Sequence, residues 1–241
     1  MKPTKRQIKD FKALAAEGPK TGIYIKDVGE AVGKPPFTEL RMMIVGPDGP
    51  YKNCLFFFRM YFTEKYPFKP PKLKFLCPYS IMCHPNLYQY YPNQSDDNVG
   101  NGKVCFSILG TFGDNPPWTP MMSYETIAKT ILMVLDDTPL RNEPRYAKSS
   151  LEKIKPYTDY VRWICLKESI PLYTQPLPEM YSMFQEEVST LLEAKKDELV
   201  DQIINLSEEF DSEPVTGNKF YNNKTDVGKE YNYTGLLDGL L

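Results

Sequence analysis

Hydrophobic residues in the first third of the chain follow a pattern that predicts a helix and then a sheet. Ile8, Phe11 and Leu14 fall on one stripe of a helix over residues 4–16. Four short runs of strand character follow, separated by turns rich in glycine and proline. The runs cover Tyr24 and its neighbours, residues 40–44, residues 54–62 and residues 72–76. We therefore expect a four-stranded antiparallel meander behind an N-terminal helix.

Residues 77–120 keep neither a helical nor a strand period for more than a few positions. Loops longer than about 15 residues are uncommon and are usually functional or disordered. We expect most of this stretch to be ordered loop, with a flexible insertion in its middle, QYYPNQSDDNVGN.

Helical periodicity resumes after the loop. Ser123 is suited to cap a helix that reaches Leu135, and Pro156 suits the first turn of a second helix. Pro171 and two later prolines indicate a linker. A long helix is then expected over residues 178–210, and the tail beyond residue 217 has no assigned element.

Composition places the chain among globular proteins, because 41% of its residues are hydrophobic and 25% are charged. The net charge of −2, without a basic stripe, argues against nucleic acid as a partner. No apolar run is long enough to span a membrane, and the charged N-terminal segment lacks the apolar core of a signal peptide. We expect a cytoplasmic protein, with the nucleus as a second compartment.

Five cysteines and a single histidine limit the chemistry. One histidine excludes multi-histidine metal sites. Cys54, Cys77 and Cys165 occupy apolar strand or helix positions, where buried thiols are usually inert. Cys105 differs because it lies in the unperiodic segment NGKVC, and it could be a nucleophile or a buried thiol.

His84, Pro85 and Asn86 form a second notable feature of the long loop. A rigid turn could present the Asn86 amide as a hydrogen-bond donor to an oxyanion. Alternatively, Asn86 could bond the loop backbone while His84 is buried and hydrogen-bonded. Both interpretations are compatible with the sequence.

The order of these motifs resembles the catalytic core of ubiquitin-conjugating (UBC) enzymes. The chain contains HPN, then NGKVCFSILGTF, then WTP and a helix. Upstream, the segment with the GPDGP turn and the YPFKPP loop is similar to the strand region of the same family. The resemblance covers about residues 4–170. NGKVCFSILGTF, RNEPRY and the helical C-terminal extension are more similar to the large, extended Z-type members than to the minimal enzymes.

The resemblance implies the α+β UBC fold: an N-terminal helix, a four-stranded antiparallel meander, a long active-site loop and C-terminal helices. It divides the chain into a catalytic core, residues 1–170, and a helical C-terminal extension, residues 171–241. No metal and no cofactor are implied, because ATP is used by the activating enzyme upstream.

The resemblance also implies roles for individual residues. Cys105 would accept ubiquitin or a ubiquitin-like protein as a thioester and pass it to a substrate lysine or to a ligase. Asn86 would support the loop and stabilise the oxyanion, and Glu143 would orient the incoming lysine or else be a solvated loop charge. His84, Pro85 and Trp118 would give structural support to the active site.

Partner surfaces follow from the same resemblance. Lys5 and Arg6 match the docking face for the activating enzyme and the ligase, although they could simply form a solvated helix face. Phe68 and Pro120 match the two loops that ligases contact. For Phe68 the alternative is a core aromatic residue, but an apolar side chain in a proline-rigidified loop is well suited to anchor a partner.

Three features depart from the family pattern. Cys105 follows Asn86 by 19 positions, a longer spacing than in the family, so residues around Gln89 to Val99 must bulge out beside the active site. Cys83 stands where tyrosine is usual, which makes a second reactive thiol possible. Met121 replaces the alanine of the family's Ser-Pro-Ala sequence, which leaves the choice of ligase open.

Two other functions compete with the conjugating enzyme. One is a non-catalytic module of the same fold that only binds ubiquitin, but such variants lack the cysteine that stands here within NGKVC. The other is a Cys–His hydrolase. The lone histidine already belongs to the HPN turn, and the sequence suggests no residue to orient it as a base.

Overall fold

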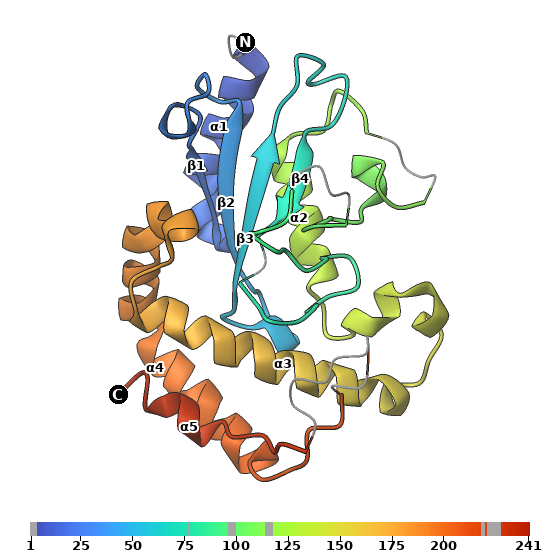
Figure 1. The fold of residues 1–241 in the computed structure, drawn as a ribbon, viewed down its shortest axis with the longest axis vertical. Coiled ribbons are helices and arrows are strands. Elements are labelled where there is room, and N and C mark those ends of the chain that lie inside the picture. Colours follow the sequence, from blue (N-terminus) through green and yellow to red (C-terminus); the bar gives the residue numbers. More distant parts are fainter. Residues whose placement is uncertain (1–3, 77, 96–99, 114–117, 218–219, 221–227) are drawn as a thin grey trace.

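A computed structural model describes residues 4–76, 78–95, 100–113, 118–217, 220 and 228–241. A single four-stranded sheet lies at the centre of the fold, and helices surround it (Figure 1). The α+β architecture expected from the sequence is confirmed. It consists of an N-terminal helix, an antiparallel sheet and C-terminal helices.

The N-terminal helix and the meander lie close to the predicted positions. Helix α1 spans Lys5–Glu17 and begins with a capping box in which the Thr4 and Gln7 side chains bond each other's backbone N–H groups. The strands are β1 Ile23–Asp27, β2 Glu39–Val45, β3 Leu55–Tyr61 and β4 Lys72–Phe75, in the order β1-β2-β3-β4 with antiparallel pairing throughout. The register pairs Ile23 with Ile44 and Phe58 with Phe75, which brings these four apolar side chains to the same face.

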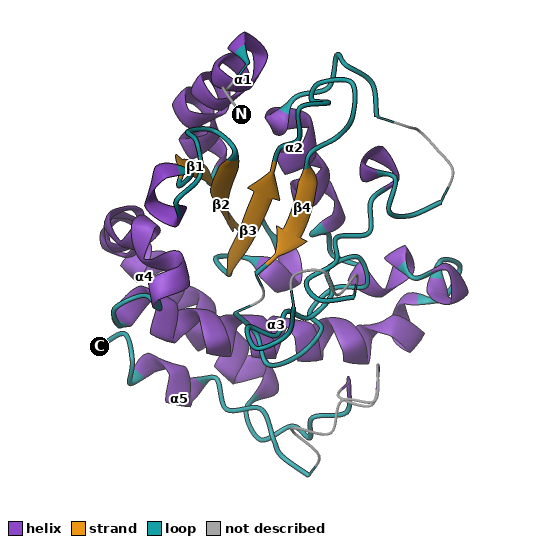
Figure 2. Ribbon diagram, turned by 45° about the horizontal axis from the view of Figure 1, so that its top comes forward, coloured by secondary structure: helices purple, strands orange, loops and turns teal. Residues whose placement is uncertain are grey.

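Helix α2, Tyr124–Val134, covers that apolar face behind β3 and β4 (Figure 2). Ser123 caps it as predicted, through a capping box with Thr126. Ile127, Ala128 and Ile131 of the helix are fully buried in the core. This packing determines where the loop between β4 and α2 must run, and that loop contains the candidate site.

The third helix differs from the prediction at both ends. Helix α3 spans Leu151–Thr174, so it begins five residues before Pro156 and continues through Pro171. Neither proline ends it, because tertiary packing overrides the local preference: its buried side chains include Val161, Ile164 and Cys165. The predicted linker is therefore wrong at Pro171, because residues 170 and 171 lie within one continuous helix, whereas Pro176 and Pro178 do lie between two helices. The division into a core and an extension stays a prediction.

The C-terminal extension covers part of the sheet face that α2 leaves open. A short 3-10 helix, Glu179–Phe184, leads into α4, Gln185–Phe210, so the α-helix starts later than predicted. Tyr181 stacks on Phe57 of β3 at 4.1 Å between ring centroids, and its hydroxyl donates to the Leu76 carbonyl at 2.8 Å. The tail adds the short helix α5, Thr234–Leu237, beyond α3 and beside α4 (Figure 1). Within the described ranges, no helix is long and apolar enough to cross a membrane.

Candidate active site

The long loop contains a two-stranded ribbon that the sequence did not reveal. The Cys105 N–H donates to the Asn86 carbonyl at 2.8 Å, and the Tyr88 N–H donates to the Lys103 carbonyl at 2.9 Å. Leu87 and Val104 form the antiparallel bridge between these two pairs. Because alternate residues of an extended chain share a face, Asn86 and Tyr88 lie on the same side of the ribbon as Lys103 and Cys105.

Gly102 attaches the ribbon to the edge of the sheet. Its carbonyl accepts a hydrogen bond from the Phe75 N–H of β4 at 2.8 Å. Gly102 has φ +65°, and a Cβ atom there would come within 2.5 Å of the Phe75 carbonyl oxygen. The glycine of NGKVC is therefore required both by its backbone conformation and by this close approach.

Asn101, next to Gly102, closes the described part of the insertion around Gln89 to Val99. Its side chain accepts from the Tyr91 N–H at 2.6 Å and donates to the Tyr91 carbonyl at 3.2 Å. The stem of the insertion is thus an extension of the ribbon. Residues 96–99, including Val99, lie outside the described residues.

The Asn86 side chain contacts the backbone of Cys105 directly. Its amide Nδ2 donates to the Cys105 carbonyl at 2.7 Å. Both residues are buried, with the Cys105 side chain 4% and Asn86 7% exposed. The Asn86 Oδ1 has no hydrogen-bond partner among the described residues. Through this bond the amide uses one of its two N–H groups to hold the loop backbone at the thiol.

His84 is a structural residue of the HPN turn. It is fully buried; its Nε2 donates to the Val134 carbonyl of α2 at 2.8 Å, and its Nδ1 accepts from the Asn86 N–H at 3.0 Å. Burial lowers the pKa of His84 from 6.5 to about 3. Both ring nitrogens are engaged and the ring is neutral, so His84 does not serve as a base for Cys105. Pro85, between them, is buried as well.

Tyr88, Lys103 and Glu143 complete the surroundings of Cys105. Partial burial raises the pKa of Tyr88, and interactions with the Cys105 thiol and the Glu143 carboxylate raise it further. The Lys103 ammonium lies 5.8 Å from the centre of the Tyr88 ring. Glu143 keeps 29% of its side chain exposed, with Arg145 at 3.7 Å. The structure therefore brings the predicted residues Cys105, Asn86 and Glu143 into one neighbourhood.

Sequence reasoning missed Tyr88 and Lys103. The signal that could have found them is their spacing of two positions from Asn86 and Cys105. Tyr88 follows Asn86 by two positions, and Lys103 precedes Cys105 by two. That spacing places side chains together only if the backbone is extended, whereas we expected a loop without strand character.

The other described cysteines are inaccessible. Cys54, Cys83 and Cys165 are fully buried, and burial raises the pKa of Cys54 to about 12. The Cys83 carbonyl accepts from the buried Tyr51 hydroxyl at 2.9 Å, so this residue belongs to the core rather than to an open site. Cys77 lies outside the described residues.

The expected partner residues gather on a different face. Phe68 is 75% exposed and Met121 is 91% exposed, and Pro120 and Lys5 are exposed as well. Phe68 is therefore not a core aromatic residue. The loops that carry Phe68 and Pro120 are joined through Trp118, whose indole Nε1 donates to the Pro67 carbonyl at 2.6 Å.

Trp118 acts differently from the expectation, and Arg6 has a further role beside the expected one. Trp118 supports the Phe68 loop rather than the active site, because its ring lies against Tyr66 and its N–H is used at Pro67. The Arg6 guanidinium donates to the Pro120 carbonyl at 2.8 Å and pairs with Asp10 at 2.7 Å. Arg6 thus fixes the loop at residues 120–122 to α1 as well as lying on the expected docking face.

In the part of the chain that the structure describes, no group of three or more histidine, cysteine, aspartate or glutamate side chains could hold an ion. What the arrangement offers is a thiol, an amide beside it and a carboxylate near it. These are the groups needed for acyl transfer through a thioester.

Comparison with known proteins gives the same family as the motifs. The ubiquitin-conjugating enzyme family model matches residues 6–162. The chain is 32% identical over 112 residues to ubiquitin-conjugating enzyme E2 Z of Xenopus tropicalis, covering 45% of this chain and 32% of the relative. It is 36% identical over 115 residues to the probable ubiquitin-conjugating enzyme protein 17 of Caenorhabditis elegans, covering 45% of this chain and 14% of the relative.

A third relative is the probable ubiquitin-conjugating enzyme E2 26 of Arabidopsis thaliana, 31% identical over 147 residues, which cover 57% of this chain and 25% of the relative. Similarity to these proteins therefore spans about a third of their length or less. The family match, however, covers more than half of this chain and includes both Asn86 and Cys105. This chain belongs to the ubiquitin-conjugating enzyme family.

Proposed function

We propose that this protein carries ubiquitin or a ubiquitin-like protein as a thioester on Cys105. An activating enzyme delivers the modifier, and a substrate lysine or a ligase cysteine then receives it. In the first step the Cys105 thiolate attacks the activating enzyme's thioester, and the activating enzyme's thiolate leaves. In the second step the incoming amine or thiol attacks the carbonyl, and the Cys105 thiolate leaves.

The observation that carries this proposal is the Asn86–Cys105 pair. The Asn86 amide is held against the Cys105 backbone at 2.7 Å on the same face of the ribbon as the thiol. A preorganised amide at this place can donate its second N–H to the oxyanion that forms when an amine attacks a thioester on Cys105. Glu143, which interacts with Tyr88, can orient the attacking lysine ammonium and accept its proton.

The absence of a usable histidine base fits this reaction better than a hydrolase. His84 is neutral, buried and engaged at both nitrogens, so it cannot activate water beside Cys105. A thioester is already activated towards an amine, and the transfer needs positioning more than a strong base.

The exposed face built from α1 and the two proline-containing loops is proposed to receive the activating enzyme and the ligase. Phe68 and Met121 supply apolar anchors, and Lys5 supplies a charge on α1. Arg6 and Trp118 hold the two loops in place, so little ordering is required when a partner binds.

The proposal is tested by incubating the protein with an activating enzyme, ATP and tagged ubiquitin or a ubiquitin-like protein, followed by a non-reducing gel. We expect an adduct that a thiol reductant removes. Cys105→Ala should abolish this adduct, whereas the core variant Cys83→Ala should retain it if it stays folded. A folded wild-type protein that forms no adduct with any modifier and activating enzyme tried would favour the non-catalytic module.

A further inference from the structure

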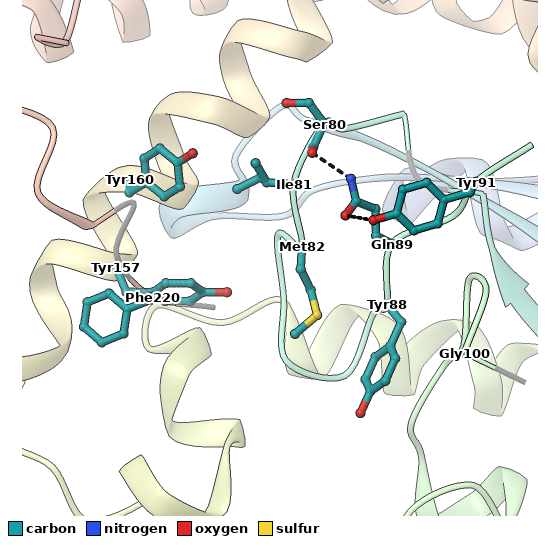
Figure 3. A pocket seen from close by; sticks show the side chains of 10 residues that line it. All are labelled: Ser80, Ile81, Met82, Tyr88, Gln89, Tyr91, Gly100, Tyr157, Tyr160 and Phe220. Carbon is teal, nitrogen blue, oxygen red and sulfur yellow. Dashed lines mark hydrogen bonds between the residues drawn. The ribbon is translucent and has the colours of Figure 1, made fainter. Parts of the chain in front are cut away.

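A cleft opens beside Cys105 that the transfer chemistry does not use. Its volume is about 450 Å³, within the range of about 300–1,000 Å³ that is typical of ligand pockets. Figure 3 shows its walls: Met82 in the middle, Tyr88 and Tyr91 of the ribbon stem on one side, and Tyr157 of α3 with Phe220 on the other.

The lining is apolar with a few neutral polar groups. The side chains are aromatic, aliphatic, hydroxyl or amide, and none of the described residues that line the cleft is acidic or basic. Such a surface favours an uncharged, apolar side chain over an aspartate or a lysine, because a charge would lose its hydration there without gaining a partner.

The rim on the ribbon side is held by a chain of hydrogen bonds. The Tyr91 hydroxyl donates to Gln89 Oε1 at 2.6 Å, and Gln89 Nε2 donates to the Ser80 carbonyl at 2.6 Å, as Figure 3 shows. The Ser80 N–H donates in turn to the Glu168 carboxylate of α3 at 2.6 Å. The insertion stem is thereby fixed to α3 through Ser80, so the cleft is formed before any ligand arrives.

Tyr88 connects the cleft to the reacting thiol. It lines the cleft, and it also interacts with Cys105 and shares a ribbon face with Asn86 and Cys105. Tyr88 is therefore common to the lining of the cleft and to the surroundings of the thiol. An extended polypeptide advances by about 3.3–3.6 Å per residue. A polypeptide whose lysine reaches Cys105 can thus place a nearby residue in the cleft.

We propose that this cleft is an acceptor subsite, which binds an apolar side chain of the substrate polypeptide within about three residues of the lysine that is modified. The proposal rests on the proposed transfer function of Cys105. In this proposal the chain itself contributes to substrate selection, through Gln89 and Tyr91 of the insertion stem and through Met82.

The test compares discharge of the charged enzyme to short peptides with one lysine. One series carries leucine within three residues of the lysine, a matched series carries serine, and a third carries arginine. We expect the wild-type protein to prefer the leucine peptides over the serine peptides by roughly tenfold or more in kcat/KM.

Three variants make the outcome specific to the cleft. Met82→Glu should remove the leucine preference and favour the arginine peptides, because it places a carboxylate in the cleft. Tyr91→Glu, at a 45% exposed rim position, should shift the preference in the same direction with little risk to folding. Ile204→Glu, at a 40% exposed position on α4, is the matched control and should keep the wild-type preference.

Two results would overturn the subsite. The first is a charged wild-type enzyme that discharges equally to leucine and serine peptides. The second is a Met82→Glu variant that slows charging as much as discharge, which would place the donor's own tail in the cleft. Failure of the wild-type protein to become charged at all would instead contradict the proposed function, so the two ideas fail separately.

Discussion

Of the residues around Cys105, some serve the proposed chemistry and others support the loop. Asn86 bonds the Cys105 carbonyl, whereas His84 joins the turn to α2 through the Val134 carbonyl. This arrangement explains why one histidine is enough for the whole chain. The ring acts as a neutral hydrogen-bonding brace, and its protonation would break the bond that it accepts from the Asn86 N–H.

The pH dependence of stability tests this role. The folded-state pKa of His84 is depressed by burial, from 6.5 to about 3. The unfolded chain therefore binds more protons between these values, and the stabilisation from neutral His84 is complete above pH 6.5 and is lost as the pH falls towards 3.

At pH 5 the free energy of unfolding is expected to fall by about 2 kcal/mol. This pH lies about 1.5 units below the ordinary pKa of 6.5, and each unit contributes about 1.36 kcal/mol. Urea unfolding of the wild-type protein and of His84→Gln at pH 7 and pH 5 measures it. The variant should be less stable than the wild-type protein at pH 7, but its free energy of unfolding should lack this part of the dependence on pH. Equal slopes for the two proteins would show that His84 is not held neutral in the folded state.

Among the elements, helix α3 connects the candidate site to the C-terminal extension. One of its faces carries Tyr157 and Tyr160 of the cleft, and further along the Tyr173 hydroxyl donates to the Asn53 carbonyl at 2.9 Å. The Asn53 side chain donates to Gln202 of α4 at 2.9 Å. The β2–β3 turn, α3 and α4 are therefore joined at one buried residue.

The packing of the extension on the sheet yields a stability prediction. Tyr181→Ala removes the ring that stacks on Phe57 and leaves the Leu76 carbonyl without that donor. We expect a loss of about 3–5 kcal/mol in the free energy of unfolding, as for other buried aromatic residues. Chemical denaturation is the measurement, and Ile204→Ala on the exposed side of α4 should change stability by less than about 1 kcal/mol. A Tyr181→Ala protein as stable as this control would mean that the extension does not stabilise the sheet.

Across the whole molecule, the sequence predicted the sheet and the first two α-helices because their apolar residues follow clear periods. The prediction was wrong at Pro171, because a proline signals a helix end only where packing does not hold the helix, and the buried face of α3 does hold it. The ribbon around Cys105 was missed for a related reason. Its backbone is paired over only a few residues, and Tyr88 is brought to the thiol by pairing across the insertion rather than by local sequence.

The central claim is that the Cys105 sulfur is the atom that carries the modifier. The most direct measurement is the chemical stability of the adduct formed by Cys105→Ser with activating enzyme, ATP and tagged ubiquitin or a ubiquitin-like protein. The wild-type adduct should be a thioester that a thiol reductant removes. The serine variant should form its adduct more slowly. That adduct should be an oxygen ester, which resists the reductant and is cleaved by base. A reductant-sensitive adduct on Cys105→Ser would place the reactive thiol elsewhere and contradict the account.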